Sequence, residues 1–163
     1  MQAKDVIKLA LKSNQDMLNG FLADLSDQDL AVRPVPGANT IAWQLGHLIS
    51  SESGIGAIIA SAKYPELPAG FKNGYNNDTA TGTPPGGYLK KTEYLDLFNK
   101  VRSATIAAVD GLSEADFDKP TTGSMAKWAP NLGALLLLTA NHTTMHTGQF
   151  TVVRRLLKKP VLF

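Results

Sequence analysis

The stretch LSDQDLAVRP at residues 25–34 returns in approximate form as LSEADFDKP at residues 112–120. Both copies read Leu-Ser-acid-x-Asp-apolar and reach a proline within a few residues. A serine followed three residues later by an acidic side chain is typical of a helix start, because each side chain can bond the other residue's backbone N–H. The repeat therefore predicts a short helical turn at two equivalent places in the chain.

Long amphipathic helices are predicted on both sides of each turn. Apolar residues recur there at spacings of three and four, over residues 3–25, 39–63, 92–110 and 131–158. Asn39 or Thr40 is suited to cap the second helix and Asn131 the fourth, while Gly111 follows the third where a left-handed residue often ends a helix. No alternating strand pattern of useful length competes. The predicted fold class is all-α, with two related helix pairs in one four-helix bundle.

Composition bounds the class of protein. A chain of 163 residues fits a single domain spanning residues 1–163, and 44% apolar content is ordinary for a globular fold. The formal net charge is only +2 without a long basic stripe, so we expect no nucleic-acid partner. The longest apolar run, near residues 132–138, is far shorter than the roughly 20 residues that span a bilayer. Since no signal peptide is evident, we expect a cytoplasmic protein without a membrane partner.

Residues 64–91 separate the two helix pairs. Prolines and glycines crowd this segment and predict a long loop without regular structure inside the domain. Loops of this length are usually functional or disordered. A lid over one end of the bundle and a plain crossover connection both fit the sequence.

The fourth predicted helix carries two of the chain's three histidines, His142 and His146. Their spacing of four places both on one helix face, where two imidazoles can bind one divalent ion. The pair by itself equally fits two polar side chains on a partly exposed face. Thr139, Gln149 and Val153 continue the same stripe, which would bury the imidazoles in an apolar face. A metal ion would then satisfy polar groups that are costly to bury unpaired.

Further candidates lie on the second predicted helix. His47 projects at the edge of the apolar stripe, where it can reach across a helix seam or face solvent. Glu52 projects into the stripe, and we interpret it as a buried hydrogen-bonding carboxylate ahead of a ligand or general base. Trp43 is expected to pack or to line the mouth of a site. On the fourth helix, Gln149 is expected to orient a water, a substrate or an imidazole.

These motifs together resemble a known family. Pro36-Gly37 followed by TIAWQLGHLIxxE, then NHTTMHTGQF and RRLLKKP, is similar to the DinB superfamily, including its YfiT-like metal-dependent hydrolases. Members are four-helix bundles, commonly homodimers, in which three histidines hold a nickel or zinc ion. The resemblance implies that His47, His142 and His146 are the metal ligands.

The resemblance also implies a range of functions. Some members are S-transferases that use a low-molecular-weight thiol such as bacillithiol or mycothiol. The related maleylpyruvate isomerases carry a glutamate where His142 stands, so that activity is not implied. Because this chain has no cysteine, any thiol must come from outside. The sequence leaves open a metal-dependent hydrolase or thiol S-transferase acting on a small molecule, a stress-associated metal-binding protein without catalysis, and a bundle whose histidines are incidental. It assigns no catalytic residue.

Overall fold

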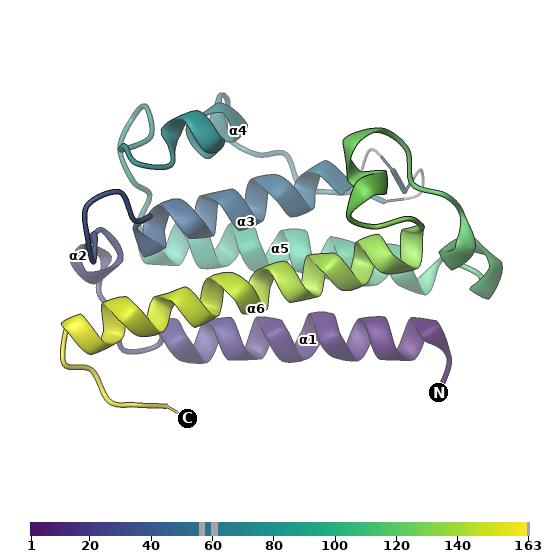
Figure 1. Cartoon of the computed structure of the whole chain (residues 1–163), viewed down its shortest axis with the longest axis horizontal. Coiled ribbons are helices and arrows are strands. Elements are labelled where there is room, and N and C mark those ends of the chain that lie inside the picture. Colours follow the sequence, from purple (N-terminus) through teal and green to yellow (C-terminus); the bar gives the residue numbers. More distant parts are fainter. Residues whose placement is uncertain (56–57, 60–61, 163) are drawn as a thin grey trace.

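The computed structural model describes residues 1–55, 58–59 and 62–162. Four long helices form one bundle (Figure 1): α1 (Ala3–Leu22), α3 (Ile41–Ile55), α5 (Lys91–Asp110) and α6 (Leu132–Leu156). The described residues contain no strand, and their one isolated bridge joins Pro120 to Asn131. The predicted all-α four-helix bundle is confirmed. No helix in this part of the chain combines the length and apolar character needed to cross a membrane.

Short helices occupy the connections. They are α2 (Asp27–Leu30), α4 (Phe71–Gly74), η1 (Asn77–Thr79), η2 (Glu114–Asp118) and η3 (Gly123–Lys127). Two of them, α2 and η2, begin inside the sequence repeat. The Ser26 N–H donates to Asp29 at 2.9 Å, and the Ser113 N–H donates to Asp116 at 2.7 Å. The two predicted helical turns are therefore present and are stabilised in the same way.

The long helices pack across the repeat pairs. Both α1 and α3 lie against α5 and α6, so the helices joined by each repeat turn do not make the main contacts of the bundle. In Figure 1, α1 and α6 run in one direction and α3 and α5 run in the other. Because α3 and α5 are parallel neighbours, the chain that joins them must run back along the bundle from the end of one helix to the start of the other. The length of a 20-residue helix such as α5 is about 30 Å. This geometry explains why the segment between α3 and α5 is long.

Several helix boundaries differ from the prediction. Thr40 caps α3, accepting a hydrogen bond from the Trp43 N–H at 3.1 Å. The helix ends at Ile55, so the prediction that it continues to residue 63 is wrong at residues 58–59 and 62–63, whereas residues 56–57 and 60–61 lie outside the described part. Gly111 has φ −77°, so a left-handed residue does not end α5. Asn131 caps α6 as predicted, accepting from the Ala134 N–H at 2.8 Å.

The apolar spacing predicts a stripe on α1 through Val6, Leu9, Leu18, Phe21 and Leu22. The last three are buried as predicted, whereas the first half of the buried face is rotated by about one residue. Val6 and Leu9 are 44% and 61% exposed, whereas Ile7 and Leu11 are buried. The reason is that α1 contacts both α5 and α6, and the direction between these two neighbours decides which side chains become the centre of the buried face. Spacing alone predicts a stripe but not its centre.

The segment over residues 64–91 is not free of regular structure as predicted, because it contains α4 and η1. These short helices lie above α3 in Figure 1. Tyr75, which follows α4, is buried and its hydroxyl is 2.7 Å from the Tyr94 hydroxyl on α5. The crossover therefore packs onto the bundle at the level of α3.

Candidate metal centre

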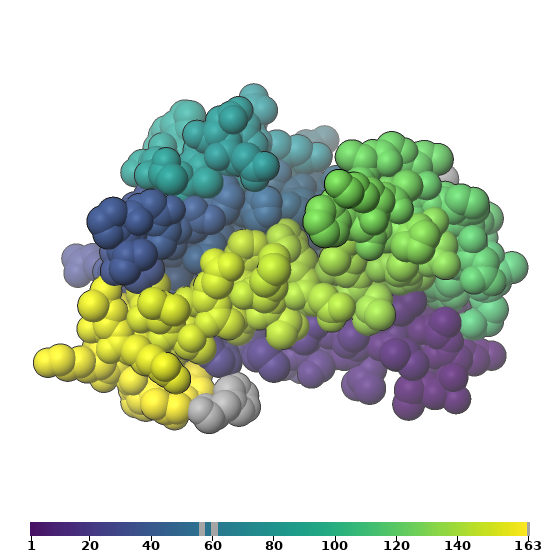
Figure 2. Space-filling view, in the orientation of Figure 1, coloured from purple at the N-terminus to yellow at the C-terminus, as the bar shows by residue number. Residues whose placement is uncertain are grey.

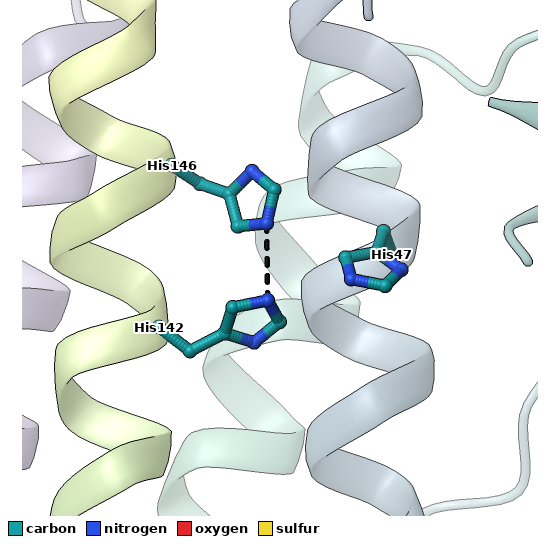
Figure 3. A group of neighbouring side chains, drawn as sticks. All are labelled: His47, His142 and His146. Atoms are coloured by element: carbon teal, nitrogen blue, oxygen red, sulfur yellow. Dashed lines mark hydrogen bonds between the residues drawn. The ribbon is translucent and has the colours of Figure 1, made fainter. Parts of the chain in front are cut away.

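Three histidines meet between two helices. His142 and His146 stand on successive turns of α6, and His47 faces them from α3 (Figure 3). One ring nitrogen from each lies within 4.8 Å of the other two. The Nε2 atoms of His142 and His146 are 3.0 Å apart. Two nitrogen ligands at 2.0–2.1 Å from a tetrahedral ion lie about 3.3 Å apart, so the spacing of this pair fits a shared ion.

Gln44 orients the His146 ring. Its Oε1 is 2.8 Å from His146 Nδ1, and its Nε2 donates to the Asn39 carbonyl at 3.4 Å. With its amide nitrogen committed to a carbonyl, Gln44 presents oxygen to the imidazole and accepts the Nδ1–H. The Nε2 lone pair of His146 is then directed at the cluster, which is how supporting hydrogen bonds prepare a histidine for a metal.

The crossover segment orients the His47 ring in the same way. His47 Nδ1 lies 3.2 Å from the Tyr75 backbone carbonyl, which can only accept, so Nδ1 carries the proton and Nε2 is free. Trp43, one turn earlier, stacks on the ring with centroids 5.0 Å apart and planes 10° from parallel. The Trp43 indole N–H donates to Thr79 Oγ1 at 3.1 Å. Trp43 is buried against His47 and tied to the crossover.

The two α6 imidazoles are neutral at pH 7. Burial, together with the neighbouring His47, lowers the pKa of His142 to about 4. Burial, together with His142 and His47, lowers the pKa of His146 to about 3. Because Gln44 holds the His146 proton on Nδ1, Nε2 of His146 carries a lone pair. The 3.0 Å contact between the two Nε2 atoms is therefore either a hydrogen bond donated by His142 or two lone pairs that face one cation. Neutral imidazole nitrogens suit zinc and nickel.

Glu52 lies beside the cluster but is engaged elsewhere. Its Oε1 accepts from Arg102 Nε at 2.8 Å and from Thr105 Oγ1 at 2.7 Å, and its Oε2 accepts from Arg102 Nη2 at 2.8 Å. Arg102 also donates to Thr143 Oγ1 and to the Leu11 carbonyl, both at 2.7 Å. One guanidinium on α5 thus ties α1, α3 and α6 together. The carboxylate is buried and hydrogen-bonded, and it fixes the helices that carry the histidines.

Gln149 does not orient an imidazole, which was one of the roles expected for it. Its side chain is exposed, and within the described residues it makes no hydrogen bond to any of the three histidines. The buried stripe of α6 passes through Thr147 and Phe150, which leaves Gln149 on the outer flank. Gln44 supports the imidazole instead. The available sequence signal was its position one turn before His47, on the same helix face.

A cavity of about 460 Å³ adjoins His142 between α3 and α6. Its walls are formed by apolar side chains, including one from η3, and by a smaller set of polar groups. The apolar lining consists of Leu48, Ile55, Ile58, Met125, Leu135 and Leu138. The green segment around η3 lies beside α6 in Figure 2, and its Met125 forms part of one side of the cavity. A molecule in the cavity would therefore contact the histidine cluster at one end.

Comparison with known proteins places the chain. The family model described as the DinB superfamily matches residues 10–150. The chain belongs to the DinB superfamily. Among solved structures, this DinB-superfamily chain is similar to a conserved protein from Enterococcus faecalis, with TM-score 0.72 and 16% identity. The likeness covers 97% of this chain and 98% of that one, and it shows a shared fold. No curated protein matches the chain, so no activity is carried over from one.

Proposed function

We propose that His47, His142 and His146 hold one divalent ion, nickel or zinc. The observation that carries the proposal is the orientation of two rings: the Tyr75 carbonyl and the Gln44 amide each take an Nδ1–H, which leaves Nε2 for the ion. Residues outside the ligand set thus select the tautomer that presents Nε2 to an ion. The neutral state of the α6 imidazoles supports the same assignment.

We propose further that the centre is catalytic and acts on a small molecule as a metal-dependent hydrolase. Held by His47, His142 and His146, a divalent ion would supply an activated water as a nucleophile near pH 7. The chain's own residues supply the rest: Gln44 and the Tyr75 carbonyl orient two of the ligands, and the cavity offers an apolar lining to a bound molecule.

An S-transferase that uses an external low-molecular-weight thiol is the second candidate. The observation that favours it is the state of Glu52, the one carboxylate among the described residues lining the cavity, which is committed to Arg102. A thiol bound at a metal loses its proton without a separate general base. The absence of cysteine requires that this thiol be a cosubstrate.

Metal content and activity test the proposal in sequence. Purified protein loaded with zinc or nickel should hold about one ion per chain, and His47→Ala, His142→Ala and His146→Ala should each lower that ratio sharply. Gln149→Ala is the matched control, because this exposed side chain shares α6 with two of the ligands. Equal metal content in all four variants and the unchanged protein would refute the site.

The loaded protein is then assayed against esters and amides, and against electrophiles with added thiols. Hydrolysis that disappears in His142→Ala supports the hydrolase, and turnover that requires thiol supports the transferase. A loaded protein that is inert in every assay is instead a metal-binding protein without catalysis. The homodimer expected from the family resemblance stays a prediction, which sedimentation equilibrium of the loaded protein tests.

A further inference from the structure

The cavity beside His142 extends along α6, and its two ends differ in chemistry. The described wall from α6 extends from Leu135 to Thr143, and Leu135 and His142 within it are seven residues or about 10 Å apart. Leu135 lies near the start of α6, at the end where η3 contributes Met125. His142 lies at the opposite end of this wall, next to His146. One end of the cavity therefore meets the cluster, and the far end is lined by aliphatic and thioether side chains, of which Ile58 is partly exposed.

Three polar side chains in the lining, those of Glu52, Thr139 and Thr143, are already hydrogen-bonded within the protein. Both oxygens of Glu52 accept from Arg102. The Thr143 hydroxyl accepts from Arg102, and the Thr139 hydroxyl donates to the Leu135 carbonyl at 2.9 Å. Arg102 itself does not line the cavity. None of the described lining residues is cationic, so a charged group at the far end would give up part of its hydration without gaining a charged partner.

We infer that this cavity binds the uncharged, apolar tail of a substrate whose single polar end lies at the histidine cluster. The inference rests on the proposed function for the polar end and adds the chemistry of the remainder. A tail of about eight carbons matches the length of the α6 wall. Molecules with a charge or a sugar at the far end do not match this lining. The cavity therefore favours fatty amides, esters or similar electrophiles over polar metabolites.

The test compares ligands that differ only at the far end. Zinc-loaded protein is titrated with the neutral fluorophore N-phenyl-1-naphthylamine, whose emission rises in apolar surroundings. Octanamide, 8-aminooctanamide and suberamic acid then compete, since all three share the amide head and an eight-carbon chain. We expect octanamide to displace the probe at a concentration at least tenfold lower than either charged analogue. Equal potency of the three competitors would overturn the inference.

Two pairs of variants locate the binding. Leu138→Trp fills the cavity and should abolish probe binding, whereas Leu137→Trp, at the neighbouring exposed position, should leave it unchanged. Ile58→Lys places a cation at the partly exposed far end and should improve competition by suberamic acid at least tenfold. Probe binding that survives Leu138→Trp, or suberamic acid that gains nothing from Ile58→Lys, would place the ligand elsewhere.

Metal content measured on the same samples separates this inference from the metal site. Leu138→Trp should keep its zinc and lose the probe, which also shows that the variant is folded. His146→Ala should lose zinc and keep probe binding, because His146 does not line the cavity. If the unchanged protein binds no zinc, the proposed function is refuted. If it binds zinc but the three competitors are equally potent, only the inference about the tail is refuted.

Discussion

Gly46→Ala tests whether the crossover segment orients the metal site. A Cβ built on Gly46 lies 2.3 Å from Tyr75 Cδ1 and Cε1 and 2.5 Å from Cζ. Ordinary carbon contacts are about 3.5 Å or longer, so the Tyr75 ring must retreat by about 1.2 Å. The ring is buried, lies 4.6 Å from the Phe71 ring and shares a hydrogen bond with Tyr94. The same residue supplies the carbonyl that holds His47.

The magnitude follows from these contacts. Overpacking costs about 1–3 kcal/mol, and loss of the Tyr75–Tyr94 hydrogen bond adds about 1 kcal/mol. Replacing a mid-helix glycine by alanine stabilises the helix by about 1 kcal/mol, which offsets part of this loss. We therefore expect urea unfolding of the metal-free protein to show a loss of about 1–3 kcal/mol. Zinc affinity, measured by competition with a chelator, should fall about tenfold or more, because His47 loses its supporting carbonyl.

Gly148→Ala is the matched control, since Gly148 also lies inside a helix near a histidine of the cluster. A Cβ there meets no described atom within 4 Å, so this variant should gain up to about 1 kcal/mol and keep its zinc affinity. A double-mutant cycle with Tyr75→Ala adds a second check, because Gly46→Ala should cost less once the ring is gone. Wild-type stability and zinc affinity in Gly46→Ala would refute the proposed coupling.

Three further predictions concern the surroundings of the cluster. Gln44→Ala should keep its helical circular dichroism and lose about 10–100-fold in zinc affinity by calorimetry, while Gln149→Ala changes neither. Arg102→Leu should lower the free energy of unfolding by about 3–5 kcal/mol in urea, because it leaves the Glu52 charge buried and unpaired; a loss below about 1 kcal/mol would contradict that role. Metal-free protein should lose stability as pH falls below 6.5, since unfolded histidines bind protons there while the α6 histidines resist until about pH 4 and 3. Urea midpoints that stay constant from pH 7 to pH 5 in the metal-free protein would contradict this assignment.

The helical framework was predictable because its signals are local. A cap such as Ser26 or Asn131 lies within a few residues of the backbone N–H groups it satisfies. The four-residue spacing of His142 and His146 likewise places them together on any α-helix. These features depend on neighbours along the chain, so they could be inferred before the packing of the helices was known. Burial of Glu52 was also predicted, from its place in an apolar stripe.

The orientation of the site was decided by contacts between distant segments. The contacts of α6 with α1 and α3 determine which of its side chains are buried. This packing buries Thr147 and leaves Gln149 exposed. His47 is held by a backbone carbonyl, and a carbonyl is the same for every residue type, so no letter of the sequence marks it. The ending of α3 at Ile55 was likewise missed, because spacing continues to suggest a helix beyond it.

The sequence by itself determined an all-α chain with repeated helix turns and a pair of histidines on one helix face, because helix hydrogen bonds and side-chain periodicity act over three or four residues. Only the tertiary structure brought His47 to that pair, placed Gln44 and the Tyr75 carbonyl behind the rings, and opened an apolar cavity beside His142. Each of these depends on how whole helices and the crossover pack. That packing follows from the summed fit of many side chains, and no short motif encodes it.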